Sequence, residues 1–238
     1  MVDKMQAVIL AGGLGTRLRP LTDRVPKVMV SVGGRPFLLH LIELLKRQGV
    51  DDIILCIGYL GHYIKEFFSS GKGFGIRIRY SEEKRSLLGT AGALKQAESL
   101  LDNHFLVING DTYLPIDYRP AEAFFLKQNI KAVMIVYDNK DDTGVKNNVE
   151  LDNSMVTRYD KESADSSLRY VETGALIIKR EALALIQGEH PISLETGLYP
   201  SLIRQKELIA YVTQQRFYDM GRPDQLKVFE EFASGGTK

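Results

Sequence analysis

Apolar and polar positions alternate along this chain with two different periods. Short apolar runs between polar or glycine-rich segments are typical of buried strands, and apolar residues repeated every three or four positions are typical of helices. The runs predict strands at Ala7–Leu10, Asp52–Ile57, Ile76–Tyr80, Phe105–Ile108, Ala132–Tyr137, Tyr170–Lys179 and Leu208–Val212. The helical spacing predicts helices at Pro36–Gln48, Tyr63–Ser69, Leu88–Leu101, Pro120–Gln128, Glu181–Ile186, Leu194–Arg204 and Pro223–Phe232. Such alternation indicates parallel strands joined by right-handed crossovers.

The pattern changes in the middle of the chain. Asn148–Leu151 and Met155–Tyr159 flank the turn Asp152-Asn153-Ser154, which predicts an antiparallel hairpin. The expected fold is therefore α/β, a three-layer Rossmann-like arrangement with a mixed, mostly parallel central sheet and a small antiparallel hairpin region. A length of 238 residues favours a single domain over 1–238, with its core at 5–232 and loose ends.

The first predicted strand runs into a glycine-rich stretch, Leu10–Pro20 (LAGGLGTRLRP). Glycine permits backbone torsions closed to other residues and lets a phosphate approach main-chain N–H groups, while Arg17 and Arg19 add positive charge. The stretch is not a dinucleotide fingerprint, because Leu18 stands where the third glycine is required. It is not a Walker A loop either, because it lacks Gly-Lys-Ser/Thr. It indicates a polyphosphate-binding loop of another kind.

Composition narrows the class of partner. The formal net charge is +1, without a block of like charges, so we expect no nucleic-acid partner. The single cysteine, Cys56, lies in an apolar run and is expected to be a core thiol, which fits a reducing cytoplasm. No apolar stretch approaches the ~20 residues that cross a bilayer, and no signal segment precedes the first strand. We therefore expect a cytoplasmic protein, without a membrane partner, that binds a small anion.

Two aspartates follow apolar segments that are far apart in the chain. Asp111 comes after Phe105–Ile108, and Asp219 lies near the C-terminal end. Open α/β sheets bind ligands beyond the carboxyl ends of their strands, where the glycine-rich loop also lies. Two carboxylates at this place suit Mg2+, which prefers oxygen ligands. Judged on its residue type alone, each aspartate is equally well a turn residue or a helix cap.

These motifs together resemble those of the sugar-1-phosphate nucleotidyltransferases, which join a nucleoside triphosphate to a sugar 1-phosphate and release pyrophosphate. The loop matches G-G-x-G-T-R-L-x-P and is followed by Pro26-Lys27. Asp111, after Gly110, matches the family's Gly-Asp step, and Asp219 its Asp-x-Gly step. The resemblance covers most of the chain and implies Mg2+ as cofactor, held by Asp111 and Asp219.

The same resemblance implies roles for further residues. The catalytic residues implied are Arg17, Lys27 and Asp111. The nucleotide-binding residues implied are Leu10, Gly12, Gly13, Gly15, Thr16, Arg17, Gly89 and Thr90, the last two in a Leu-Gly-Thr-Ala-Gly base segment. In that segment Leu87 replaces the usual preceding proline, and the nearby carboxylates of Glu82 and Glu83 are weaker candidates for a base edge.

The sugar-phosphate end is implied less completely. Lys161, in a step with Asp160 in place of the family's glutamate, is the candidate phosphate ligand. Glu172 and Thr173 match the segment that holds sugar hydroxyls, and an acidic residue within an apolar run is costly unless paired, so Glu172 is a candidate without any analogy. Asn147 or its neighbour Asn148 stands where related enzymes carry a sugar-contacting glycine.

Within the family, the short chain, the run Gly34–Leu38 and the final Asp-Met-Gly-Arg-Pro most resemble the bacterial D-glycero-α-D-manno-heptose 1-phosphate guanylyltransferases. This implies GTP and a sugar 1-phosphate as substrates. Mannose-1-phosphate guanylyltransferases, other hexose-1-phosphate nucleotidyltransferases, a phosphocholine cytidylyltransferase and a non-catalytic nucleotide-sugar-binding regulator are the alternatives. A homodimer is the expected assembly, although apolar helix faces serve a core equally well.

Overall fold

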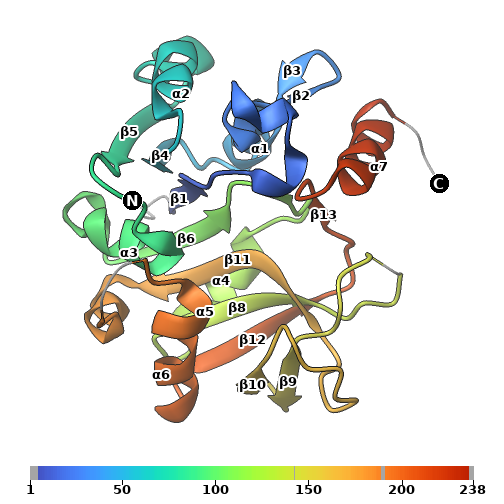
Figure 1. Cartoon of the computed structure of the whole chain (residues 1–238). Coiled ribbons are helices and arrows are strands. Elements are labelled where there is room, and N and C mark those ends of the chain that lie inside the picture. The colour runs from blue at the N-terminus through green and yellow to red at the C-terminus, as the bar shows by residue number, and fades with distance from the viewer. Residues whose placement is uncertain (1–4, 142, 189–190, 236–238) are drawn as a thin grey trace.

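A mixed central sheet organises the molecule (Figure 1). The structure is a computed structural model that describes residues 5–141, 143–188 and 191–235. Within these residues nine strands form the sheet, in the spatial order β5 (Arg77–Glu82), β4 (Asp52–Ile57), β1 (Gln6–Ala11), β6 (His104–Asn109), β11 (Val171–Lys179), β8 (Ala132–Tyr137), β12 (Leu208–Thr213), β10 (Met155–Tyr159) and β9 (Val149–Asp152). All of them except β10 and β11 run in one direction. The predicted mixed, mostly parallel sheet with its antiparallel hairpin is confirmed.

Helices cover both faces of the sheet, so the predicted three layers are present. One face carries α1 (Phe37–Arg47), α2 (Gly61–Phe68), α4 (Arg119–Leu126) and α7 (Pro223–Ala233). The other carries α3 (Gly89–Gln96), the 3-10 helix η6 (Arg180–Leu185), α5 (Leu194–Gly197) and α6 (Tyr199–Arg204). Because successive side chains of a strand point to opposite faces, Ala7 and Ile9 of β1 enter the first core and Val8 enters the second. In the described part of the chain, no helix has the length and apolarity that crossing a bilayer requires.

Two of the predicted helices form 3-10 helix over all or part of their length. Leu88–Leu101 is α-helical only over α3 and continues as the 3-10 turn η5 (Glu98–Leu100). At Ala97 the N–H is shared between the carbonyls of Ala93 and Leu94, both at 3.2 Å, which marks the change of hydrogen-bond spacing. The predicted helix Glu181–Ile186 is the 3-10 helix η6. The apolar periodicity located both segments but did not distinguish the two helix types.

The predicted helix Leu194–Arg204 is interrupted at Leu198, which has φ −125° and ψ −54°. Pro200 explains the break, because it lacks the N–H that a continuous helix would direct to Thr196, and its ring crowds the preceding turn. The segment therefore forms two short helices, α5 and α6. The expected loose ends, residues 1–4 and 236–238, lie outside the described residues.

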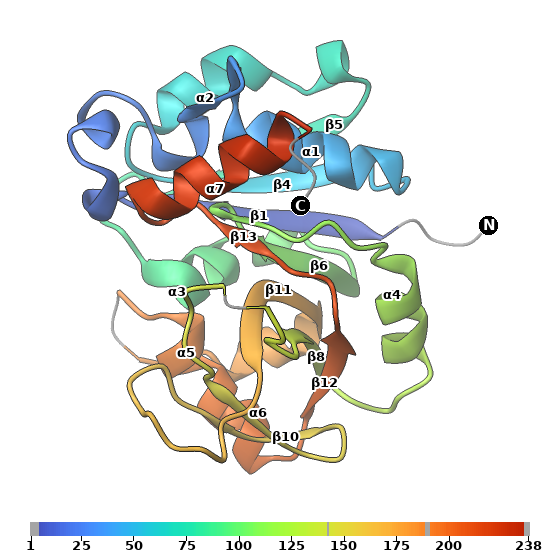
Figure 2. The same ribbon diagram turned by 90° about the vertical axis from the view of Figure 1, so that its right-hand side faces the viewer.

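Two small sheets that the apolar pattern did not predict complete the fold. One pairs β2 (Ser31–Val32) with β3 (Arg35–Pro36), and the other pairs β7 (Thr112–Tyr113) with β13 (Tyr218–Asp219). Helix α7 follows β13 and packs on α1, where the rings of Phe37 and Phe229 lie 4.9 Å apart (Figure 2). Helix α7 is thus attached to the first half of the sheet.

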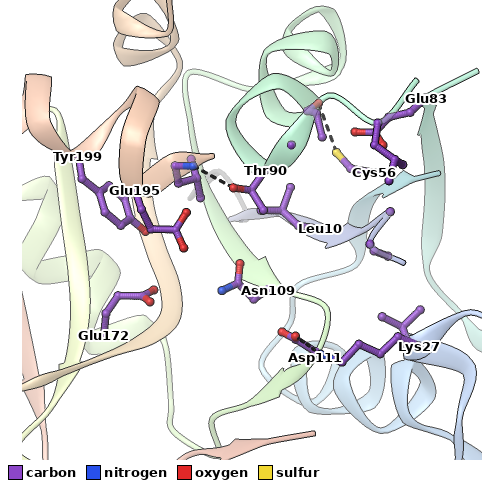
Figure 3. A pocket seen from close by; sticks show the side chains of 18 of the residues that line it. Leu10, Lys27, Cys56, Glu83, Thr90, Asn109, Asp111, Glu172, Glu195 and Tyr199 are labelled. Carbon is purple, nitrogen blue, oxygen red and sulfur yellow. Dashed lines mark hydrogen bonds and ion pairs between the residues drawn. The ribbon is translucent and has the colours of Figure 1, made fainter. Parts of the chain in front are cut away.

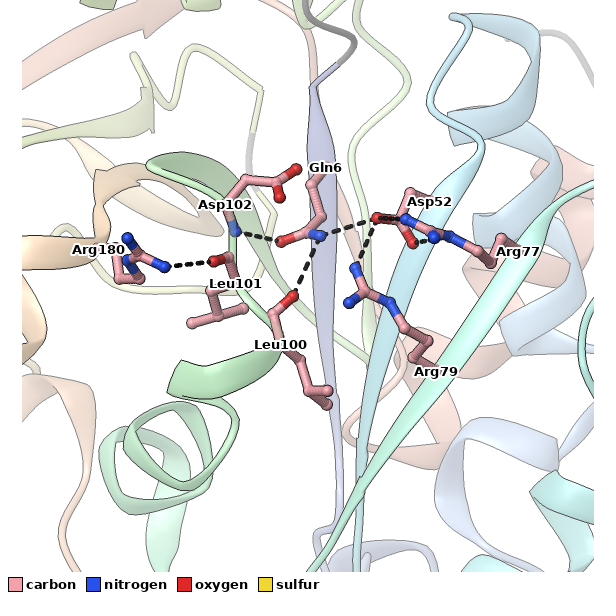
Figure 4. Close-up of polar contacts among 8 residues, drawn as sticks. All are labelled: Gln6, Asp52, Arg77, Arg79, Leu100, Leu101, Asp102 and Arg180. Carbon is pink, nitrogen blue, oxygen red and sulfur yellow. Dashed lines mark hydrogen bonds and ion pairs between the residues drawn. The ribbon is translucent and has the colours of Figure 1, made fainter.

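A polar network closes the amino ends of β1, β4 and β5 (Figure 4). Gln6 donates to Asp52 at 2.8 Å and accepts the N–H of Asp102 at 3.0 Å. Arg77 and Arg79 donate to the same carboxylate. Burial acts to raise the pKa of Asp52, but these hydrogen bonds outweigh it and hold the pKa below its usual range. The network ties this end of the sheet together and leaves the opposite end open for ligands.

Candidate functional site

The cleft lies beyond the carboxyl ends of β1, β4 and β6, as expected for an open α/β sheet. A first cavity of about 320 Å3 is lined by part of the glycine-rich loop and by the start of α3. A second cavity of about 330 Å3 adjoins it. The two share Asn109, Asp111, Lys161 and Glu172. Figure 3 shows Asn109 between Glu172 on one wall and the pair Lys27–Asp111 on the other.

Close packing shapes the glycine-rich loop. Gly15 has φ 63°, and a Cβ there would lie 3.0 Å from side-chain atoms of Lys27 and Thr22. The Thr22 hydroxyl donates to the Gly15 carbonyl at 2.8 Å. At Gly12 a Cβ would lie 3.1 Å from the Glu83 carboxylate, so a larger residue would push into the first cavity. The glycines therefore allow the loop to fold tightly beside Lys27 and expose its main chain at the cavity.

Lys27 and Asp111 form an ion pair in the middle of the site. Gly110 brings Asp111 there, because a Cβ at Gly110 would lie 2.7 Å from the Leu10 carbonyl. Burial acts to raise the pKa of Asp111, but the ammonium of Lys27 and, more weakly, the guanidinium of Arg17 outweigh it and hold the pKa below its usual range. Asp111 is therefore a carboxylate at neutral pH, which a metal ligand must be.

Asp219 reaches the same place through the small β7–β13 sheet, where it pairs with Thr112. Asp219 therefore belongs to a small separate sheet and not to the central one, and its expected closeness to Asp111 is found. The main chain joins the two segments as well, since the Met220 N–H donates to the Asp111 carbonyl at 2.9 Å. Burial and the charge of Asp111 raise the pKa of Asp219.

The donor chemistry of this pair fits Mg2+. Asp111 and Asp219 both line the second cavity. The negative charge of Asp111 helps to raise the pKa of Asp219, and two carboxylates that repel each other in this way attract a divalent cation. Among the described residues, no group of three or more His, Cys, Asp or Glu side chains forms an all-protein metal site. Mg2+ usually has only one or two carboxylate ligands and completes its shell with water and substrate phosphates. Asp111 and Asp219 are therefore suitable ligands.

The wall formed by the start of α3 is closely packed. Gly89 has φ 76°, and a Cβ there would lie 2.4 Å from the Ile192 carbonyl, so only glycine fits. The Thr90 hydroxyl accepts the N–H of Leu194 at 2.8 Å and ties α3 to α5. Glu83 lines this cavity, whereas Glu82 pairs with Lys65 at 2.6 Å outside it. Of the two carboxylates weighed for a base edge, the structure directs Glu83 to the site.

The opposite wall carries an ion pair that sequence reasoning missed. Lys161 pairs with Glu195 of α5, and both side chains line the first cavity. Glu172 reaches the cavity through a bulge in β11 between residues 172 and 175, where its Oε1 accepts the Gly174 N–H at 2.8 Å. The Thr173 hydroxyl donates to the Ile135 carbonyl at 2.8 Å, so Thr173 supports the bulge.

The structure gathers most, but not all, of the sequence-predicted site residues. Leu10, Gly12, Gly13, Lys27, Gly89, Thr90, Asp111, Lys161 and Glu172 line the first cavity. Arg17, Asp111, Lys161, Glu172, Thr173 and Asp219 line the second. Gly15, Thr16 and Asn147 line neither cavity. Asn147 accepts from Asn139 at 2.8 Å, and Asn148 faces the second cavity and accepts the Glu172 N–H at 2.8 Å.

Cys56 is buried, as expected, although it lies in the wall of the first cavity. Burial raises the pKa of its thiol to about 12. The thiol donates to the Ala93 carbonyl at 3.7 Å (Figure 3). A thiol with this pKa is not ionised at neutral pH, which makes Cys56 a poor nucleophile.

Glu172 yields a prediction about stability. Burial raises its pKa to about 7 from 4.5; Lys161 opposes the rise, and Glu195 and Asp111 add to it. The folded protein therefore binds this proton more tightly than the unfolded chain, and the associated stability is complete below pH 4.5 and lost as pH rises through 7. The neutral glutamine of E172Q does not ionise, so this variant keeps its stability at pH 8. After solvent screening we take the destabilisation of the wild type by the ionised Glu172 as about 2 kcal/mol, so the Tm of E172Q should exceed that of the wild type at pH 8 by about 5 °C.

Calorimetric melting curves at pH 5 and pH 8 measure this difference. The Tm advantage of E172Q should shrink at pH 5, and the exposed Glu162 provides the control variant E162Q, whose Tm should match that of the wild type at both pH values. An equal Tm for E172Q and the wild type at pH 8 would contradict the raised pKa.

Comparison with known proteins identifies the family of this chain. Residues 6–233 match the family described as nucleotidyl transferase. A D-glycero-alpha-D-manno-heptose 1-phosphate guanylyltransferase of Campylobacter jejuni is 31% identical over 220 residues, which cover 92% of this chain and 96% of the relative. The crystal structure of HddC from Yersinia pseudotuberculosis complexed with GMP-PN has a TM-score of 0.81 and 28% identity, covering 97% of this chain and 100% of that one.

The yeast relatives are longer than this chain. A mannose-1-phosphate guanyltransferase of Kluyveromyces lactis is 33% identical over 237 residues, which cover 97% of this chain but 63% of the relative. The chain therefore spans less than two thirds of the length of such proteins. Because the family match extends over nearly all of the described residues, this chain belongs to the nucleotidyl transferase family.

Proposed function

We propose that this protein transfers a nucleotidyl group from GTP to a sugar 1-phosphate, forming a GDP-sugar and pyrophosphate. One observation carries the proposal: the glycine-rich loop, the pair Lys27–Asp111, Asp219 and Lys161 all line two adjoining cavities at one end of the sheet. This arrangement provides main-chain donors and cations for a triphosphate, carboxylates for a divalent cation, and a separate cation for a second phosphate. Family membership supports the same reaction class.

The proposed chemistry needs no general base from the protein. A sugar phosphate is mostly dianionic at neutral pH, because its second pKa is about 6. One of its oxygens attacks the α-phosphorus, a new P–O bond forms, and the bond from that phosphorus to the bridging oxygen breaks, with its electron pair leaving on pyrophosphate. Bound Mg2+ would offset phosphate charge. Lys161 orients the attacking phosphate, and Lys27 and Arg17 stabilise charge around the α-phosphate and the leaving group.

The described histidines agree with chemistry that needs no base. His40 binds the Val32 carbonyl at 3.0 Å, and His104 binds Glu122 at 3.1 Å. His62 lies against the ring of Tyr63 in α2, with the two rings tilted by 36°. His190 lies outside the described residues. None of the three described histidines lines either cavity.

A heptose 1-phosphate of the D-glycero-α-D-manno type is our first candidate for the sugar, and GTP for the nucleotide. The Campylobacter jejuni relative carries that name and matches this chain over almost its whole length. The similar HddC structure of Yersinia pseudotuberculosis is a complex with GMP-PN, a guanine nucleotide analogue. Glu83 adds a physical reason for guanine, because its carboxylate lines the first cavity and is a suitable acceptor for the N1–H and 2-amino groups of that base. Mannose 1-phosphate is the second candidate, favoured by the names of the yeast relatives.

A matrix of substrate pairs tests both the proposed reaction and the proposed choice of nucleotide and sugar. Four nucleoside triphosphates are combined with the heptose 1-phosphate, mannose 1-phosphate, glucose 1-phosphate and phosphocholine, and the nucleotide product is separated by chromatography. We expect turnover with GTP and the heptose phosphate to exceed every other pair, and chelation of Mg2+ by EDTA to abolish it. A preference for mannose 1-phosphate would show that the heptose assignment is wrong and that mannose 1-phosphate is the substrate. Use of phosphocholine alone, or nucleotide binding without product from any pair, would overturn the proposed reaction.

A further inference from the structure

The second cavity has a basic side to which sequence reasoning assigned only one residue. Arg17 of the 3-10 helix η1 (Thr16–Leu18), Lys146 of the loop before β9, and Arg222 at the start of α7 all line it. Among the described residues, neither Arg17 nor Lys146 has a carboxylate within ion-pair distance. Arg222 pairs with Asp224 at 3.2 Å, but the two side chains are 45% and 69% exposed, so this pair is weak. The three cations remain available to an anion.

Two glycines allow the arginines to approach the main chain beside the carboxylates. A Cβ at Gly221 would lie 3.1 Å from Nη2 of Arg17 and 2.9 Å from Oδ1 of Asp219. A Cβ at Gly144 would lie 3.4 Å from Nη2 of Arg222. Gly221 is the immediate neighbour of Arg222, so Arg17 rests against the segment that carries Arg222. Both guanidinium groups are thus built into the wall of the second cavity that holds Asp219.

The chemistry of these groups indicates a polyanion. Guanidinium groups bind phosphate oxygens in a bidentate manner, and a pyrophosphate carries more negative charge than Arg17 alone balances. Under the proposed function Lys27 and Lys161 already serve the α-phosphate and the attacking phosphate, and each also balances a carboxylate, Asp111 and Glu195. Arg222 and Lys146 are therefore the cations that remain for phosphates beyond the reacting one.

We propose that Arg222, together with Arg17 and Lys146, binds the pyrophosphate that leaves in the reaction. The assignment rests on the proposed function, because the leaving group follows from it. It extends the leaving-group site from the glycine-rich loop across the second cavity to the β13–α7 turn. Pyrophosphate bound there would contact residues from three segments: η1, the loop before β9 and the start of α7.

Titration calorimetry with inorganic pyrophosphate and Mg2+ tests this assignment directly. We expect R222Q to weaken pyrophosphate binding about tenfold, since one charge-assisted bidentate contact is lost, while R222K keeps the charge and loses less. Binding of mannose 1-phosphate, measured in the same way, should not change. The matched control is R119Q, because Arg119 also starts a helix and pairs with an aspartate two residues away, outside the cleft. Melting temperatures should agree, since both arginines are exposed.

The outcomes separate the leaving group from the sugar phosphate. Pyrophosphate affinity that is unchanged in R222Q, or a wild type that does not bind pyrophosphate, would overturn the assignment. A loss of mannose 1-phosphate affinity without a loss for pyrophosphate would also overturn it and move Arg222 to the sugar site. A wild type that binds pyrophosphate through Arg222 but forms no nucleotide product from any pair in the substrate matrix would contradict the proposed function and leave the anion site standing.

Discussion

Replacing Asp111 by asparagine should reduce turnover about 10³-fold while the fold is kept, because the proposed Mg2+ site would lose a charged ligand worth several kcal/mol in the transition state. The substitution preserves shape and volume, so packing behind the site is unaffected. It also leaves Lys27, which is 11% exposed, without its ion-pair partner. A nearly buried ammonium beside a neutral amide no longer balances the charge of the site. Formation of the GDP-sugar under saturating substrates measures the effect.

The control for this variant is Asp117→Asn. Asp117 also pairs with a cation, Arg119 at 2.6 Å, but on the surface outside the cleft. D117N should turn over like the wild type. Circular dichroism and melting curves establish that D111N is folded. Turnover of folded D111N within tenfold of the wild type would remove Asp111 from the reaction centre.

Replacing Lys27 by methionine should lower kcat/KM by about 10² to 10³, the range found when one preorganised group that stabilises developing charge is removed. Methionine keeps the apolar stem and removes only the ammonium. In the wild type this ammonium holds the pKa of Asp111 below its usual range, against the effect of burial. Without it, Asp111 and Asp219 repel one another with less compensation, so the site loses charge balance even before substrates bind.

Steady-state kinetics of K27M and K27R distinguish charge from shape. K27R keeps the positive charge and should retain more activity than K27M, although a guanidinium does not reproduce a compact ammonium. Lys46 provides the matched control, because its ammonium also has one partner, the Phe74 carbonyl at 2.6 Å, but on the exposed side of α1. K46M should behave like the wild type. Equal kcat/KM for K27M and K46M would contradict the proposed role.

Much of the architecture could be predicted from local pattern. The strand predicted at Asp52–Ile57 has the bounds of β4, and the helix predicted at Pro36–Gln48 contains α1. These elements depend on interactions between near neighbours and on the side of the element that is apolar. The glycine-rich loop was recognisable for the same reason, since its glycines satisfy local backbone and packing demands.

Features that depend on pairing between distant segments could not be predicted from the local pattern of residues. β11 lies between β6 and β8 and is antiparallel to both, and the apolar pattern does not determine that position. Glu195 meets Lys161 across 34 positions, and no periodicity or motif in the chain marked it. Such contacts depend on the total packing of the two cores, to which many residues each contribute a little.

Asp111 and Asp219, the proposed metal ligands, show most clearly what local sequence predicts and what only the tertiary structure decides. Local residue order identified Asp111 and Asp219 as candidates, because Asp111 directly follows Gly110 and Asp219 lies two residues before Gly221, each after an apolar segment. Their meeting depends on the pairing of Asp219 with Thr112, and on α7, which is held to α1 by Phe37 and Phe229. Residue types and short-range spacing specify which chemistry the chain can offer. Strand register and helix packing bring those groups together, because they depend on surfaces buried between segments that are remote in the chain.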